Sequence, residues 1–400
     1  FGTAPAIVYI TEIARSDLRG SLISFGPAIS SVGMVMAYIE GWFLSWRLTA
    51  WLCVFYSAIS FILLMLIPES PMWLIAKEKN SRALKSLEWF TKSKPNSNRE
   101  GRKTPAEIQF ENLREINEQK IASGMNRGGI SEVLQGFLKP TGYKPFLILF
   151  GLFIFQQFSG VYITLFYSIQ FFEEMGTNIN PYLCSIFIGL VRAGMSGVNT
   201  YMLKTFRRRP LLLWSSLGMA ITMLISGLFT VWIKDGTTTL KWVPVLATLL
   251  YVVSSMIGLL TIPWTMTAEL FPLEIRAIAH SCLYSAAYLI MFFSIQNYDG
   301  LKRLCGGVAG VQWFFAAVSL AGLVYTGLFL PETYKSELSE IEDYFKYNTL
   351  YLLRKKGPAD PRRGSRYSYR KPPSDIVKKI VLDTVSENSN EQNKNLLTVN

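Results

Sequence analysis

The sequence predicts an all-α membrane protein that crosses the bilayer several times, and three observations support this fold class. Half of the residues are hydrophobic, 14% are aromatic and only 17% are charged, against about 25% charged residues in a typical soluble domain. The charges are concentrated in a few parts of the chain, mainly residues 69–144 and 331–400. The apolar tracts between them reach the roughly 20 residues that a membrane-spanning helix needs.

Taken in chain order, the apolar tracts predict the following elements. Residues 1–10 are expected to end one span. Eight further tracts are each long enough to form a span: 21–39, 48–67, 145–172, 182–203, 210–233, 242–268, 277–298 and 308–330. One of these tracts contains a charged residue, Arg192. An arginine at mid-membrane costs about 2.5–3.5 kcal/mol on insertion scales, so we expect it to face a water-filled cavity or an acid.

Two blocks of spans flank a polar segment, which predicts four regions. Residues 1–68 are expected to form the remainder of an N-terminal bundle, and residues 145–330 a C-terminal bundle. Residues 69–144 are expected to form a cytoplasmic loop with short helices. Residues 331–400 are expected to form a cytoplasmic tail, largely disordered after about residue 350, because it is rich in Arg, Lys, Ser, Asn and Pro.

One helix of the polar segment has a recognisable start. Thr104 is followed by Pro105, with acidic residues in the next turn. Threonine is a favourable N-cap, and proline is tolerated at the first helical position, where its missing N–H is not needed. We therefore expect a helix to begin at Pro105.

The net charge of +12 comes from basic residues whose positions agree with the predicted topology. Of the 40 Lys and Arg residues, 14 lie in 69–144, and the tail holds another large share. If the spans alternate, both regions lie on one side, which is the pattern of cytoplasmic loops in membrane proteins. Nucleic acid is therefore not an expected partner; the bilayer is.

An acid–arginine pair followed by a proline–glutamate turn occurs twice along the chain. Glu12 and Arg19 are seven residues apart near one span end, and Glu269 and Arg276 repeat that spacing near another. Two spans after each pair, a proline–glutamate turn follows, at Glu69 and at Glu332. Such internal similarity predicts two like-oriented halves, as in transporters. Because the second half holds six spans, we expect three full spans and part of a fourth ahead of this sequence.

At these residues the chain resembles the sugar porter family of the major facilitator superfamily. The motifs "YITEIARSDLRG", "PESPMWL", "QQFSG", "IPWTMTAELFPLEIR" and "PETYKSEL" occur in the order of the family. Two further stretches, "APAIVYITEI" and "FRRRPLLLWSSLGMA", are similar to the insect facilitated trehalose transporter-like branch. The resemblance implies the major facilitator fold, with two pseudo-symmetric helical bundles, the first lacking its first three spans here. It also implies a central site for a mono- or disaccharide and alternating access.

The resemblance points to a set of substrate-binding residues, with some departures from the family. Gln156, Gln157 and Trp264 match its sugar-contact positions. Tyr162 and Arg192 stand where glucose carriers have asparagine. Two further contact positions also differ, with Met256 in place of a glutamate and Ala287 in place of an asparagine. The departures put glucose itself in doubt as the substrate.

The residues themselves favour such a site. A sugar presents hydroxyls and apolar C–H faces, and each glutamine amide supplies an acceptor and two N–H donors. The alternative is that Gln156 and Gln157 tie helices together. Pro263 should bend or break its helix, and Trp264 beside it can stack on a sugar, although tryptophan also anchors spans at the membrane interface.

A second set of residues is expected to form a cytoplasmic charge network that gates the transporter. The family's basic signature reads "KTFRRR" here, with Lys204 and Arg207 replacing an acid and a glycine. This departure puts the family's form of the network in doubt. The expected members are Glu12, Arg19, Glu69, Arg208, Glu269, Arg276 and Glu332.

The function that these observations favour is facilitated diffusion of a hexose or trehalose across the plasma membrane. A proton-coupled symporter and a non-transporting sugar sensor are the alternatives. An enzyme is not expected, because the sequence contains no HExxH or GxSxG motif and a single histidine, His280. No cofactor or metal is expected either, and a partner of the tail cannot be named.

Overall fold

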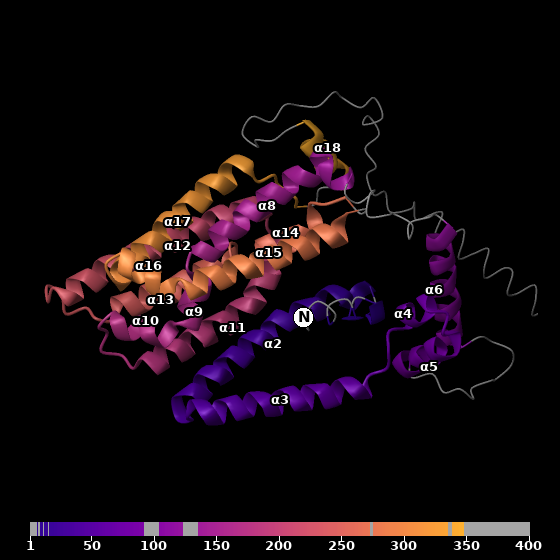
Figure 1. The fold of residues 1–400 in the computed structure, drawn as a ribbon, viewed down its shortest axis with the longest axis horizontal. Coiled ribbons are helices and arrows are strands. Elements are labelled where there is room, and N and C mark those ends of the chain that lie inside the picture. Colours follow the sequence, from indigo (N-terminus) through magenta and orange to yellow (C-terminus); the bar gives the residue numbers. More distant parts are fainter. Residues whose placement is uncertain are drawn as a thin grey trace, which may run out of the picture. The chain divides into compact units, whose positions relative to one another are not determined.

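The computed structural model describes residues 6, 9–10, 12–14, 16–91, 104–122, 135–272, 275–334 and 338–347 (Figure 1). Within these ranges the regular elements are helices, and none of the described residues forms a strand. Seven helical segments are long and apolar enough to cross a membrane, and two of them, residues 140–166 and 243–267, each combine two consecutive helices. The predicted class, an all-α membrane protein, is therefore confirmed. The tail after about residue 350, expected to be disordered, lies outside the described residues.

Two long helices come first in the chain. Helix α2 (Ser16–Phe43) and helix α3 (Trp46–Leu66) are joined by a short turn (Figure 1). None of the side chains of helix α3 is buried, and most of its apolar side chains are exposed. Helix α2 packs on α11 (Pro181–Thr205), where Val35 lies against Gly189.

The polar segment contributes three short helices: α4 (Pro71–Ala76), α5 (Asn80–Thr91) and α6 (Pro105–Ala122). The backbone N–H of Thr104 donates to Glu107 at 2.7 Å, and the N–H of Glu107 donates to the Thr104 hydroxyl at 3.4 Å. This reciprocal arrangement is a capping box, which satisfies N–H groups that a helix start leaves free. The expected helix start at Pro105 is therefore confirmed.

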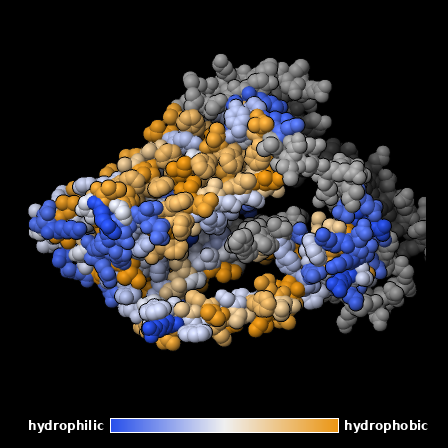
Figure 2. Space-filling view, in the orientation of Figure 1, coloured by the Kyte–Doolittle hydropathy of each residue, from blue (hydrophilic) through white to orange (hydrophobic). Residues whose placement is uncertain are grey.

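The helices from residue 140 onward contain most of the buried core. Figure 2 shows hydrophobic side chains along their flanks and hydrophilic ones near their ends, as expected for a surface in contact with lipid. Besides α11, they are α8 (Pro140–Phe158), α9 (Val161–Phe166), α10 (Ser168–Glu174), α12 (Arg208–Lys234), α13 (Val243–Ile257), α14 (Ile262–Glu269), α15 (Arg276–Gln296), α16 (Tyr298–Leu304), α17 (Val308–Phe329) and α18 (Leu338–Tyr347).

Helices α12 and α17 are joined by buried polar side chains. The Gln312 amide donates to the Ser226 hydroxyl at 3.0 Å, and the Thr230 hydroxyl donates to the Gln312 carbonyl oxygen at 3.1 Å. All three side chains are fully buried. Hydrogen bonds of this kind hold membrane helices together where lipid is as apolar as the side chains around it.

The stretch 145–172 was expected as a span from its apolar length, and residues 140–166 are long and apolar enough to cross a membrane. Within this stretch the structure forms three consecutive helices, α8, α9 and α10. The first interruption is at Gly160, whose φ of 91° is a conformation that other residues rarely adopt. The ring of Phe315 lies where a Cβ at Gly160 would be. The break therefore depends on a neighbour from α17 that the local sequence does not reveal.

Candidate functional site

The break between α13 and α14 is the first feature of the site. Helix α13 ends at Ile257 and α14 begins at Ile262, one residue before Pro263, as the proline predicts. Backbone groups in the intervening turn have lost their helical partners and need others. The N–H of Leu259 donates to the Ser215 hydroxyl at 2.9 Å. A side chain of α12 therefore provides a hydrogen-bond partner for one of the backbone N–H groups in the turn.

Gln156 satisfies the carbonyl groups of the same turn. Its side-chain amide is fully buried and donates to the carbonyl oxygens of Leu259, at 2.7 Å, and Leu260, at 2.9 Å. One side chain of α8 thereby supplies both hydrogen bonds. In this structure Gln156 ties two helices together, the alternative that the sequence left open for the paired glutamines. Its predicted contact with a substrate remains a prediction.

Gln157 lies differently from its neighbour. Its side chain is fully buried, and its amide nitrogen is 3.5 Å from the side-chain oxygen of Gln156. Among the described residues, the side-chain oxygen of Gln157 has no hydrogen-bond partner. A buried acceptor without a partner costs about 1–3 kcal/mol. Gln157 is therefore able to accept a hydrogen bond from a ligand or from water.

A pocket of about 240 Å³ lies between α2, α9, α11, α14 and α15. It brings together three predicted substrate-binding residues from different helices, whereas Gln156 and Gln157 are not among its lining residues. The pocket is lined by Met34, Tyr162, Leu165, Phe166, Arg192, Trp264, Tyr288 and Met291.

Aromatic rings cluster around Trp264, which together with Tyr288 lines one side of this pocket. The Trp264 ring centroid lies 4.8 Å from Phe153, 4.7 Å from Tyr284 and 5.6 Å from Tyr288. Tyr284 and Tyr288 were not predicted. Their spacing of four residues in the tract 277–298 puts them on one helix face, but that spacing does not reveal which helix they meet. His280, one turn earlier, contacts the Thr267 hydroxyl through Nδ1 at 2.8 Å.

Arg192 contributes the only charged side chain among the residues that line this pocket. Its Nε and Nη1 atoms are buried and have no hydrogen-bond partner in the part of the chain that the structure describes. The sequence predicted that this arginine would face a cavity or an acid. The structure places it at a pocket whose lining residues include no acid.

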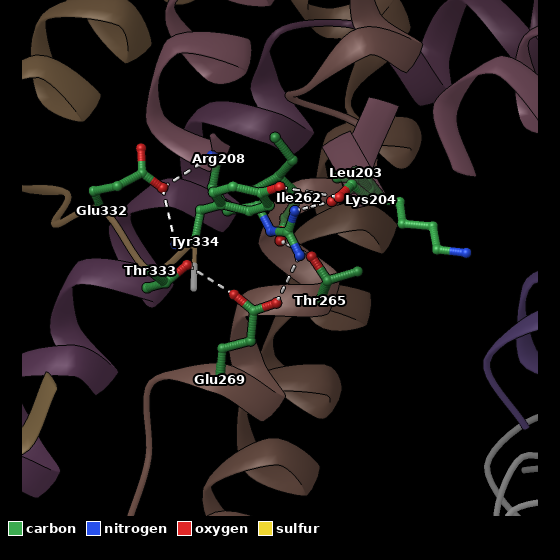
Figure 3. A network of polar contacts seen from close by, with 9 residues as sticks. All are labelled: Leu203, Lys204, Arg208, Ile262, Thr265, Glu269, Glu332, Thr333 and Tyr334. Carbon is green, nitrogen blue, oxygen red and sulfur yellow. Dashed lines mark hydrogen bonds and ion pairs between the residues drawn. The ribbon is translucent and has the colours of Figure 1, made fainter. Parts of the chain in front are cut away.

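Three members of the predicted charge network lie together where α12, α14 and α17 end or begin (Figure 3). Arg208 Nη2 and the Glu269 carboxylate form an ion pair at 3.2 Å. Glu332 accepts from the backbone N–H groups of Arg208, at 3.0 Å, and Arg209, at 3.2 Å. A carboxylate at this position satisfies free N–H groups and lies at the positive end of the helix dipole. Glu332 is thus an N-terminal cap of α12.

Two residues of this cluster were missed from the sequence. The Thr333 hydroxyl donates to Glu269 at 2.7 Å, and the Tyr334 ring lies 5.6 Å from the Arg208 guanidinium carbon. Both directly follow the second proline–glutamate turn, so their position in the motif was the available signal. They connect the end of α17 to α12 and α14 (Figure 3).

The other predicted network members lie elsewhere. Arg276 donates to the carbonyl oxygen of Phe271 from Nε, at 3.1 Å, and Nη2, at 2.9 Å. Glu12 accepts from the Ser70 hydroxyl, and Glu69 is exposed. The side chain of Arg19 lies outside the described residues.

An ion pair that was not predicted joins α10 to α16, at the opposite end of α15 from Arg276. Lys302 Nζ lies 2.8 Å from Glu174 and 3.5 Å from Asp299. The hydrogen bond to Glu174 raises the pKa of Lys302 above its usual value. Because the partners are 128 residues apart in sequence, local spacing gave no sign of this contact.

Solved structures of known proteins share this arrangement of helices. The inward-open xylose transporter XylE from E. coli is 22% identical, with a TM-score of 0.65, over 84% of this chain and 68% of that one. The proton:xylose symporter XylE bound to 6-bromo-6-deoxy-D-glucose is 23% identical, with a TM-score of 0.59, over 85% and 70%. The chain therefore shares the fold of these two structures, the second of which is described as a major facilitator superfamily protein.

The family follows from the sequence comparison. The family model described as "Sugar (and other) transporter" matches residues 2–345, so the chain belongs to that family. The Facilitated trehalose transporter Tret1 of Polypedilum vanderplanki is 28% identical over 84% of this chain and 64% of its own length. Trehalose transporter 1 of Drosophila melanogaster is 28% identical over 84% and 38%. The chain thus spans less than two thirds of these relatives.

Proposed function

We propose that the complete protein moves a mono- or disaccharide across a membrane by facilitated diffusion. The observation that carries the proposal is the pocket in which Trp264, Tyr162 and Arg192 meet beside a broken helix. Broken helices within a membrane are tolerated where they are buried in protein or line a cavity. The matching family and the names of its trehalose-transporting relatives support a sugar as the substrate.

The chemistry of the surrounding residues fits a polyol. Trp264 offers a flat apolar face for the C–H side of a sugar ring, and Tyr162 offers a hydroxyl. Gln157 does not line this pocket, and its side-chain oxygen, which has no partner among the described residues, is proposed to accept from a sugar hydroxyl. Buried polar groups that a substrate must satisfy favour ligands with hydroxyls over analogues without them.

The charge network is proposed to hold one side of the transporter closed. Its ion pairs and hydrogen bonds would break and form again during each transport cycle. In this proposal Arg208, Glu269 and Glu332 form its core, with Glu12, Arg19, Glu69 and Arg276 as further predicted members. We place residues 69–144 and 331–400 in the cytoplasm because of the distribution of basic residues, and we propose the plasma membrane as the membrane that the protein crosses. Residues 1–68 and 145–330 would then belong to two bundles that move against each other.

Uptake of radiolabelled sugar into vesicles tests this function. With the complete protein we expect saturable uptake of trehalose or glucose that does not require a proton gradient. Trp264→Ala should lower the uptake rate at low sugar concentration about tenfold, because contacts to an aromatic face contribute roughly 0.5–1.5 kcal/mol beyond the area that they bury. Trp214→Ala is the matched control, since Trp214 is 69% exposed on α12, and its uptake should be unchanged.

Two results would contradict the proposal. Uptake no greater than in empty vesicles, with sugar binding retained, would instead indicate a sensor. Uptake that occurs only with a proton gradient would indicate a symporter.

A further inference from the structure

We infer that the pocket binds a sugar carrying an anionic group, a carboxylate or a phosphate, more tightly than it binds the neutral sugar. The inference rests on the proposed function and concerns the same pocket. It specifies the chemical class of the preferred substrate. The residue that carries it is Arg192.

The guanidinium of Arg192 lacks a countercharge among the described residues. Its Nε and Nη1 atoms are buried without a hydrogen-bond partner. The other pocket-lining side chains are aromatic, aliphatic or thioether groups. The titratable groups that act on it electrostatically are the phenols of Tyr162 and Tyr38, which carry no charge at neutral pH.

A buried charge of this kind is costly unless a ligand or another group pairs with it. Charged residues in membrane spans are rare, and they mark binding sites and pathways when they face a cavity. The planar guanidinium presents two parallel N–H donors that match a carboxylate or phosphate, and such charge-assisted hydrogen bonds are about twice as strong as neutral ones. A neutral sugar hydroxyl uses the same donors less well.

The other residues that line the pocket can contact the sugar ring of such a ligand. Trp264 and Arg192 line the same space of about 240 Å³. A sugar ring against Trp264 could therefore extend its anionic substituent toward Arg192. The alternative is a carboxylate from a part of the protein outside the described residues, which would neutralise Arg192 and leave no preference for an anion.

Equilibrium binding to the purified complete protein separates these alternatives. The probes are glucose, glucuronate and glucose 6-phosphate, and tryptophan fluorescence is the readout because Trp264 lies in the pocket. We expect at least one anionic probe to bind roughly 10- to 100-fold more tightly than glucose, the range that hydrogen bonds to a charged group contribute. The two anionic probes show whether a carboxylate or a phosphate is preferred.

Variants of Arg192 identify the source of this preference. Arg192→Gln should bring the affinity ratio of anionic to neutral probe close to one, and Arg192→Lys should retain part of the preference. The control is Arg303→Gln, which changes the net charge equally at an exposed position of α16, and it should keep the full preference.

Each outcome bears on the inference. Equal affinity of the unmodified protein for glucose and both anionic probes would overturn it and leave the proposed sugar transport standing. A preference that persists in Arg192→Gln would also overturn it. If none of the three probes binds, the inference fails, and uptake of trehalose then decides the proposed function separately. The comparison in the unmodified protein decides the matter even if a variant does not fold.

Discussion

Gln156→Ala is expected to cause a large loss of stability, larger than any other change to the paired glutamines. The substitution removes the two hydrogen bonds to the carbonyl oxygens of Leu259 and Leu260, which lie at 2.7 and 2.9 Å. Each buried group left without a partner costs about 1–3 kcal/mol, so the free energy of unfolding should fall by roughly 2–6 kcal/mol. The measurement is the midpoint of thermal unfolding of the purified protein in detergent.

Gln157→Ala is the matched control, one residue away on the same helix. Its amide nitrogen is 3.5 Å from Gln156, and its side-chain oxygen has no partner among the described residues. We expect its stability to change little while its affinity for sugar falls. Equal destabilisation by the two substitutions would contradict the assignment of Gln156 as the side chain that satisfies the broken helix.

Gly160→Ala should have a comparably large effect for a different reason. The φ of Gly160 is 91°, which costs a residue with a side chain roughly 1–3 kcal/mol. A methyl group there would also overlap the Phe315 ring, and overpacking typically costs a further 1–3 kcal/mol. We therefore expect the free energy of unfolding to fall by roughly 2–6 kcal/mol, with a matching loss of sugar uptake.

Gly197→Ala in α11 provides the comparison. No neighbouring heavy atom lies within 4 Å of a Cβ built at Gly197, and alanine favours a helix more than glycine does. Its unfolding midpoint should be unchanged or slightly higher. If Gly160→Ala behaved like Gly197→Ala, the sharp turn between α8 and α9 would not be a feature of the folded protein.

The features predicted correctly from the sequence depend on short-range rules. The length of the apolar tracts predicted the membrane spans, and Pro263 predicted the break before α14. Thr104 and Pro105 gave the capped start of α6. In each case the residues that determine the feature are neighbours in the chain, so their spacing is visible in the sequence.

The features that sequence analysis missed depend on contacts between distant residues. The turn at Gly160 is shaped by Phe315 from α17, and the partners of Gln156 lie 103 and 104 residues away. Tyr288 reaches the pocket because α15 packs beside α14 with a particular face inward. These outcomes depend on how the helices are rotated and packed, which apolar composition alone does not specify.

The candidate site was foreseen in part. Tyr162, Arg192 and Trp264 line one pocket, although they come from three separate helices. The glutamines beside them turned out to be held in the core, with Gln156 bound to backbone carbonyls. A residue type that suits a polyol also suits a broken helix, so amide chemistry in a sequence does not distinguish these roles.

An experimental structure of the complete protein bound to a transported sugar tests the central claim most directly. We predict density for the sugar ring against the Trp264 ring, in the pocket between α9, α11, α14 and α15, with any anionic group beside the Arg192 guanidinium. Sugar density elsewhere, together with a protein carboxylate paired to Arg192, would contradict this account.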